Sequence, residues 1–126
     1  MSRVRALACT GLSIPLLGSA ANHVLQVIEP PVGGDDLGVE MWRLMRDGGL
    51  FVWVVLGHLV TGVMLLVPRW RFLGALVQLP ITLGIAAFNL TMFPPGVVPA
   101  LIMVALNLIA LADFTALKAL VATGRR

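Results

Sequence analysis

Long apolar stretches separated by short polar or proline-rich breaks make up most of the chain. The clearest stretch, residues 50–67, has no formal charge and one ionisable side chain, His58, near its middle. At ~1.5 Å per residue such a helix covers roughly 27 Å, close to the ~30 Å hydrocarbon core of a bilayer. The pattern predicts an all-α fold, a polytopic membrane four-helix bundle, with spans at about 6–28, 50–67, 72–93 and 97–117.

Prolines and glycines mark the predicted ends of the spans. The Glu-Pro-Pro sequence at 29–31 ends the first span, because proline lacks an amide donor and disfavours helix in the residue before it. Tight turns are predicted at 68–71 and 94–96. Pro15 and Pro80 lie inside the first and third spans, where we expect them to bend the helices. The whole chain, 1–126, is predicted to be one transmembrane domain.

A short amphipathic helix is predicted between the first two spans. Apolar residues recur there at i, i+4, i+7 and i+8, namely Leu37, Met41, Leu44 and Met45. Asp35 or Asp36 can cap its start, and the glycines at 48–49 end it. With Trp42 beside the apolar stripe, we expect this helix to lie in the membrane interface or over the mouth of the bundle. The alternative is an ordinary loop helix that packs on its own protein.

Composition supports an integral membrane protein in contact with the lipid bilayer. The chain is 59% hydrophobic and only 12% charged, whereas about a quarter of the residues in soluble domains are charged. A net charge of +3 and a sequence pI near 10.5 are typical of some nucleic-acid-binding proteins. Here the positive charges lie beside apolar segments, so membrane topology explains them and no nucleic-acid partner is expected. Arg3, Arg5 and the following apolar run also resemble a signal peptide, but we expect an uncleaved first helix because the run continues to residue 28.

The basic residues predict an orientation. All of those outside the 37–47 segment fall on one side of the predicted spans: Arg3, Arg5, Arg69, Arg71, Lys118, Arg125 and Arg126. Cytoplasmic loops are enriched in Lys and Arg, so we expect an N-in, C-in topology in the cell inner (plasma) membrane. Asp113, the only acid in a predicted span, lies near this inner end. We expect Arg69 or Arg71 to pair with it, since the helix dipole there disfavours a negative charge.

Polar residues inside the spans form the candidate site. Counted at ~1.5 Å per residue from the outer boundary, Asn89 lies about 6 Å deep, Asn22 and His23 about 8 Å, and His58 about 12 Å. Lipid offers no hydrogen bonds, so such side chains should face the bundle or a hydrated cavity. Gln78 and Thr82 share a helical stripe with Asn89. A polar seam in the outer half of the bundle is therefore predicted.

Three interpretations of this seam are open. It can be interhelical glue, in which neutral side chains hydrogen-bond one another. It can be a pocket that opens outward, in which His58 exchanges a proton or hydrogen-bonds a carbonyl or quinone head group. Finally, His23 and His58 can serve as the two axial ligands of a b-type haem. No nucleophile–base set, phosphate loop or dense cluster of metal ligands accompanies them, so we expect no catalytic activity of the chain on its own.

Short motifs resemble the DoxX-like family of small four-helix membrane proteins over about residues 10–115. The matching segments are Asn22-His23, the run from Thr61 to Leu66 with Pro68-Arg69-Trp70, and Phe88-Asn89-Leu90 followed by Pro94-Pro95-Gly96. Two positions depart from the family pattern: His58 stands where the family commonly has glutamate, and Asn89 where it commonly has histidine. Family members are similar to a subunit of a thiosulfate–quinone oxidoreductase or to membrane partners of redox and thiol-stress enzymes.

Together these features predict a small accessory subunit beside a larger redox or energy-converting membrane complex. We expect its outer half to hold a quinone or lipid pocket lined by Asn22, His23, His58 and Asn89. A transporter or channel-like bundle for protons or a small solute is one alternative. A b-type haem-binding membrane cytochrome is another.

Overall fold

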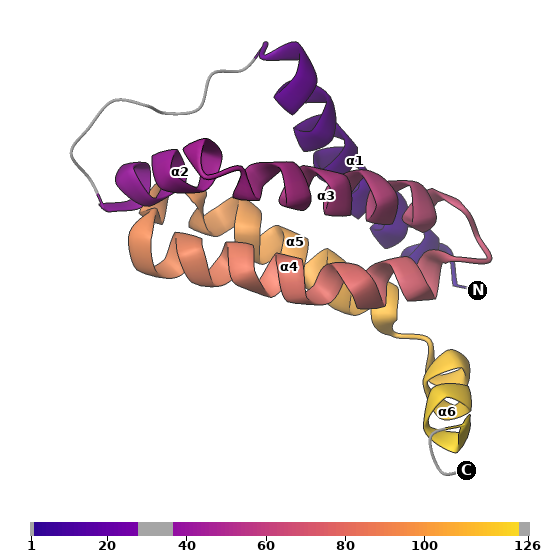
Figure 1. The fold of residues 1–126 in the computed structure, drawn as a ribbon. Coiled ribbons are helices and arrows are strands. Elements are labelled where there is room, and N and C mark those ends of the chain that lie inside the picture. The colour runs from indigo at the N-terminus through magenta and orange to yellow at the C-terminus, as the bar shows by residue number, and fades with distance from the viewer. Residues whose placement is uncertain (1, 28–36, 124–126) are drawn as a thin grey trace.

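The computed structural model describes residues 2–27 and 37–123, and every regular element in these ranges is helical (Figure 1). The all-α prediction is confirmed for this part of the chain. In order, the elements are α1 (Arg3–Leu25), α2 (Leu37–Asp47), α3 (Leu50–Leu66), α4 (Arg71–Met92), the 3₁₀ turn η1 (Pro94–Gly96), α5 (Val97–Leu111) and α6 (Phe114–Thr123).

The longer helices have the length and composition of membrane spans. Among the described residues α1, α4 and the continuous unit Pro94–Leu111 each meet this test, whereas α2 and α3 meet it only together, across a bend of 83°. The 17 residues of α3 alone cover about 25 Å, slightly less than a typical hydrocarbon core. These helices indicate a membrane protein.

The first helix begins at a side-chain cap and ends at a left-handed residue. The Ser2 hydroxyl accepts a hydrogen bond from the Arg5 amide at 3.2 Å, as expected for an N-cap. The helix continues through Pro15 and ends at Leu25, because Gln26 turns to φ 51° and donates its amide to the Asn22 carbonyl. The predicted span extended to residue 28.

The fourth predicted span, 97–117, is too long. Helix α5 ends at Leu111, and a separate helix, α6, begins at Phe114. Asp113 causes the break, since its Oδ1 accepts hydrogen bonds from the amides of Thr115 and Ala116 at 3.2 and 3.1 Å. An aspartate that caps a new helix competes with continuation of the old one, and apolar periodicity does not reveal this competition.

Four helices pack into one bundle, in which α1 contacts α3 and α5, and α4 contacts α3 and α5. α1 crosses the others at an angle, and its C-terminal end stands away from them (Figure 1). The fully buried apolar core lies near the opposite end of α1, and consists of Cys9, Leu12, Leu16, Leu65, Ala75 and Ala110. The bundle is therefore tightest toward the end where α1 begins.

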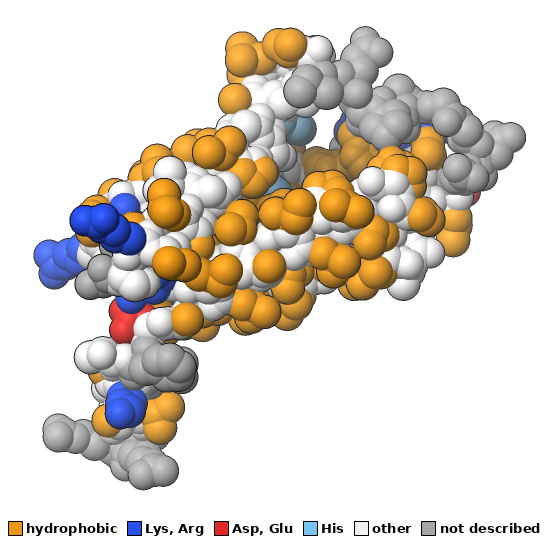
Figure 2. Space-filling view, turned by 180° about the vertical axis from the view of Figure 1, so that it is seen from behind, with side chains coloured by type: hydrophobic (Ala, Val, Ile, Leu, Met, Phe, Trp, Pro, Cys, Tyr) orange, Lys and Arg blue, Asp and Glu red, His pale blue; other side chains and the backbone are white. Residues whose placement is uncertain are grey.

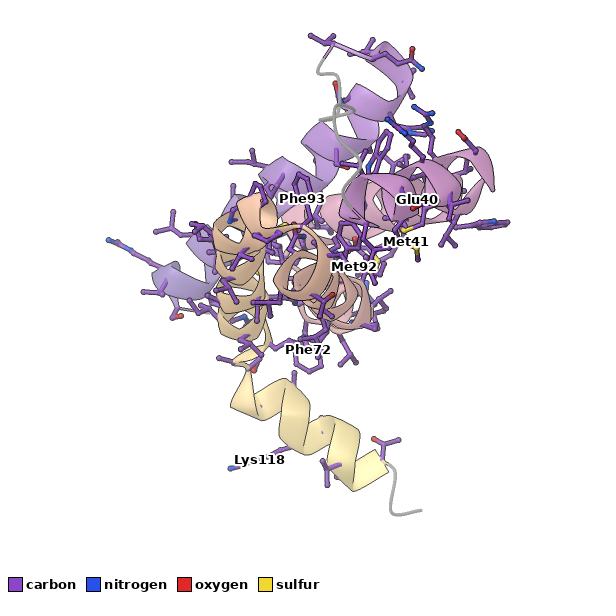
Figure 3. All side chains as sticks on the ribbon, turned by 90° about the vertical axis from the view of Figure 1, so that its left-hand side faces the viewer. Glu40, Met41, Phe72, Met92, Phe93 and Lys118 are labelled. Carbon is purple, nitrogen blue, oxygen red and sulfur yellow. The ribbon has the colours of Figure 1, made fainter. Side chains whose placement is uncertain are left out.

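Two short helices lie across the bundle axis, one at each end (Figures 1 and 3). α2 lies against the end where α4 meets η1, and we call this the α2 end. α6 lies beyond the other end, which carries exposed Arg3 and Arg69 and which we call the arginine end. Figure 2 shows apolar side chains over the flanks of the bundle and basic side chains gathered at the arginine end.

Candidate functional site

A pocket of about 210 Å³ lies where α2 crosses the C-terminal end of α4. It is lined by residues from α2, by two residues of α4 and by the residue that follows α4: Gly38, Val39, Trp42, Phe88, Asn89 and Phe93. We call this the α2 pocket. Of the four site residues predicted from the sequence, Asn89 alone is among those that line it.

A glycine lets α2 lie directly on the end of α4. A Cβ atom on Gly38 would collide with the carbonyl oxygen of Met92, so only glycine permits this backbone approach. The next residue, Val39, is 5% exposed and faces the bundle. Figure 3 shows Met92 and Phe93 beside α2, which carries Glu40 and Met41. The roof of the pocket, which is α2, therefore approaches the end of α4 at backbone distance.

Trp42 contacts two neighbouring side chains, Phe51 and Arg46. The Phe51 ring lies 5.2 Å away, between centroids, at an interplanar angle of 53°. The guanidinium carbon of Arg46 lies 5.1 Å above the Trp42 ring, a cation–π contact. Trp42 therefore contributes a pre-oriented aromatic surface to the pocket.

The opposite wall combines two aromatic rings with one amide. Phe88 and Phe93 stack at 6.5 Å with an interplanar angle of 18°. Asn89, 8% exposed, donates one Nδ2 hydrogen to the Ile85 carbonyl at 2.8 Å, and its Oδ1 lies against Gly96. An amide nitrogen carries two hydrogens, so Asn89 keeps one N–H for a ligand. A cavity of about 150 Å³ holds benzene, so the α2 pocket has room for one substituted ring.

His58 lies elsewhere in the bundle. Its side chain is 5% exposed, and neither ring nitrogen has a hydrogen-bond partner. It shares a face of α3 with Gly62, whose Cα approaches Leu16 and Leu17 of α1. His58 therefore also faces α1. It lies one helical turn closer to the α2 end than the contact of Gly62 with α1.

Asn22 and His23 lie near the end of α1, half-buried and exposed, respectively. Figure 2 shows histidine surface in the hollow between this end of α1 and the rest of the bundle. The α2 pocket includes neither histidine. The structure thus divides the predicted site: Asn89 lines a pocket between α2 and α4, whereas His23 belongs to α1 and His58 faces α1 from α3.

Part of the predicted polar seam is a buried chain of hydrogen bonds between α3 and α4. The Thr61 hydroxyl donates to Gln78 Oε1 at 2.6 Å, and Gln78 Nε2 donates to the Thr82 hydroxyl at 3.2 Å. Asn107 of α5 donates to the Ala75 carbonyl of α4 at 2.8 Å. These contacts join helices to one another, as the glue interpretation expects.

At the arginine end, Asp113 pairs with Arg5, not with Arg69 or Arg71 as predicted. Arg5 Nη1 lies 2.5 Å from Asp113 Oδ2. Arg71 instead donates from Nε to the Leu65 carbonyl at 3.0 Å, near the end of α3. The Ala116 amide, followed by the charge of Arg5, lowers the pKa of Asp113 below its usual range, against an opposing contribution from burial.

Most of the residues that line the α2 pocket were missed by sequence reasoning. The sequence pattern indicates Trp42 only as an aromatic residue beside an apolar stripe, and Val39, Phe88 and Phe93 only as parts of predicted helices or motifs. Two sequence patterns contribute these residues: Gly-Val-x-x-Trp in the short helix and Phe-Asn…Phe at the end of α4. Nothing in the sequence shows that the two segments meet.

Comparison with known proteins gave no match: no family model, no curated protein and no solved structure matches the chain. The resemblance to DoxX-like proteins stays a prediction from short motifs.

Proposed function

We propose that the chain is a small membrane subunit that holds a quinone-type head group in the α2 pocket, beside a larger redox or energy-converting complex. The aromatic-lined pocket with one amide carries this proposal. The DoxX-like motifs point in the same direction, since members of that family are associated with quinone-linked redox enzymes. The proposal keeps the predicted quinone pocket but moves it to α2 and α4, with Asn89 as the predicted residue that lines it.

The chemistry of the lining suits a flat, carbonyl-bearing ring. Trp42, Phe88 and Phe93 offer aromatic surface for stacking, and the second N–H of Asn89 can donate to a ring carbonyl. An isoprenoid tail would leave along the apolar flanks of the bundle, where large hydrophobic side chains such as Leu90 are exposed. No redox-active protein group is required in this arrangement, because the subunit binds the quinone and its partner exchanges electrons with it.

Fluorescence of Trp42 gives a direct test. Trp53 and Trp70 are 72% and 52% exposed, so both can be replaced by phenylalanine to leave Trp42 as the only tryptophan. We expect a short-chain quinone to quench this variant saturably in nanodiscs. A matched variant that keeps only Trp70, near the arginine end, should show weak, linear quenching. Equal, linear quenching in both variants would overturn the proposal.

Substitution of Asn89 tests the hydrogen bond. Asn89→Ala removes the amide without adding bulk beside Gly96, and we expect roughly fivefold to tenfold weaker binding, as for loss of about one hydrogen bond. Thr91→Val is the control, because the exposed Thr91 hydroxyl bonds only carbonyls of its own helix.

Purification in mild detergent tests the proposed partner complex. Recovery of the chain alone from native membranes would count against a subunit role.

A further inference from the structure

The C-terminal helix α6 is set apart from the bundle. It begins three residues after the end of α5 and runs across the bundle axis beyond the arginine end (Figures 1 and 3). Figure 3 shows the labelled Lys118 extending outward from α6, away from the long helices. Its orientation is the one that a helix has when it lies in the plane of a membrane surface.

The start of α6 is fixed to α1. Asp113 accepts the amides of Thr115 and Ala116 through Oδ1, and Arg5 pairs with its Oδ2. The same carboxylate therefore caps α6 and joins it to the beginning of the bundle. This double contact holds the first turn of α6 at the level of the arginine end.

The sequence of α6, FTALKALVAT, has two distinct faces. At about 100° per residue, its three polar residues, Thr115, Lys118 and Thr123, fall within a sector of roughly 140°. The opposite side is entirely apolar in sequence and includes Val121, which is 55% exposed. Ala119, also exposed, lies on the polar side. Because Val121 is exposed on this apolar side, we expect an apolar partner there.

Charge indicates which partner fits. Exposed Arg3 and Arg69 lie at the same end of the molecule as Lys118, and the nearby acid Asp113 is already paired with Arg5. Figure 2 shows basic side chains on the surface of that end. Basic residues beside an amphipathic helix suit the phosphates of an anionic lipid leaflet.

We propose that α6 lies in the surface of an anionic phospholipid leaflet, with its Val121 face toward the acyl chains and Lys118 against lipid phosphates. This interaction is separate from ligand binding in the α2 pocket, which lies at the other end of the bundle. It gives the chain a preference for membranes rich in anionic lipid.

Single labels on opposite faces of α6 test the proposal in the full-length chain. Val121→Cys and Ala119→Cys, each in a Cys9→Ala background, carry an environment-sensitive fluorophore in nanodiscs that contain acyl-chain-quenching lipids. We expect at least about twofold stronger quenching at Val121 than at Ala119. The difference should increase when phosphatidylglycerol replaces part of the phosphatidylcholine. Lys118→Gln should remove that increase, and Lys118→Arg should keep it.

Two results would overturn the proposal. Weak quenching at both positions would show that α6 stands in water or contacts a protein instead of lipid. Equal quenching at both positions, with no response to anionic lipid, would show that α6 is immersed without a preferred face. Saturable quenching of Trp42 by quinone is measured separately, so failure at α6 is distinguishable from failure at the α2 pocket.

Discussion

Polar side chains inside the helices differ in whether they have partners. Thr61, Gln78 and Thr82 form a continuous chain in which each is at most 1% exposed and hydrogen-bonded. His58 lies one turn from Thr61 on the same helix, yet both of its ring nitrogens lack a partner. Burial of an unsatisfied polar group costs about 1–3 kcal/mol. We therefore expect the imidazole to lower the stability of the bundle.

Replacing His58 by leucine should raise the free energy of unfolding, by about 1 kcal/mol, because two unsatisfied nitrogens are removed and no hydrogen bond is lost. Thr61→Val should instead lower it by about 1 kcal/mol, since Gln78 Oε1 then loses its donor. Unfolding in mixed micelles, followed by circular dichroism, measures both. If His58→Leu lowered the free energy of unfolding by more than Thr61→Val does, the imidazole would have a hydrogen-bond partner in the membrane.

At the scale of elements, α2 is held in place by backbone proximity. Gly38 lies against the Met92 carbonyl, and Gly49, at φ +77°, allows the sharp turn from α2 into α3. The apolar residues Leu37 and Leu44 on the same helix remain 64% and 63% exposed. α2 thus packs on its own protein, as one sequence-based alternative expects, and its exposed apolar residues are compatible with the other, a position in the membrane interface.

Gly38→Ala should displace α2 and open the pocket, because the added methyl group collides with the Met92 carbonyl. We expect about tenfold weaker quinone binding, roughly 1.4 kcal/mol, and a red shift of Trp42 emission as water reaches the ring. Gly84→Ala is the matched control, since nothing lies within 4 Å of a Cβ there and helix propensity improves. Identical binding in both variants would show that α2 does not form the roof of the site.

The contact between α6 and α1 should depend on pH. The pKa of Asp113 is lowered in the folded protein, so its contribution to stability is present above the unfolded value of about 3.9. That contribution is lost as the pH falls through the lower, folded pKa. Spin labels on Leu73→Cys and Ala119→Cys, in the Cys9→Ala background, should give a narrow distance distribution near pH 7. The distribution should broaden in acid.

Asp113→Asn provides the matched variant for this measurement. Asparagine keeps an oxygen that can cap α6 but has no charge for Arg5. We expect it to give the broad distribution already near pH 7. A narrow distribution in this variant would show that the cap alone fixes α6.

The elements were more predictable than their contacts. The bounds of α3 and α4 agree with the predicted spans within one residue, because glycine and proline breaks flank strongly apolar runs. The break at Asp113 was missed, since a local side-chain cap overrode apolar continuity. The α2 pocket was missed because it depends on where α2 lies after a bend of 83°, and hydrophobic periodicity carries no information on that angle. His58, Asn22 and Asn89 have similar depths, but depth does not specify which side of a helix faces which neighbour.

At the scale of the whole molecule, the two ends differ in charge and in architecture. The start of α1, the α3–α4 turn and α6 lie at the arginine end, whereas α2 and η1 lie at the other (Figure 1). If the long helices cross a bilayer, this arrangement places residues near both ends of the described chain on one side. More of the described basic residues lie at that end, namely Arg3, Arg5, Arg69, Arg71 and Lys118, than at the α2 end, which carries Arg43 and Arg46 beside Glu40 and Asp47. This excess of positive charge favours the cytoplasmic face.

Labelling from one side of the membrane tests this N-in, C-in topology. In the Cys9→Ala background, Ser2→Cys and Thr123→Cys mark the arginine end, and Asp47→Cys marks the α2 end; all three positions are exposed. In right-side-out vesicles, an impermeant maleimide should label Asp47→Cys and leave the other two unmodified until the membrane is permeabilised. Inverted vesicles should give the opposite pattern, which controls for intrinsic reactivity. If α1, α3, α4 and α5 each cross the membrane once, Ser2 and Thr123 lie on the same side. Labelling of Ser2→Cys and Thr123→Cys from different sides would therefore contradict this topology.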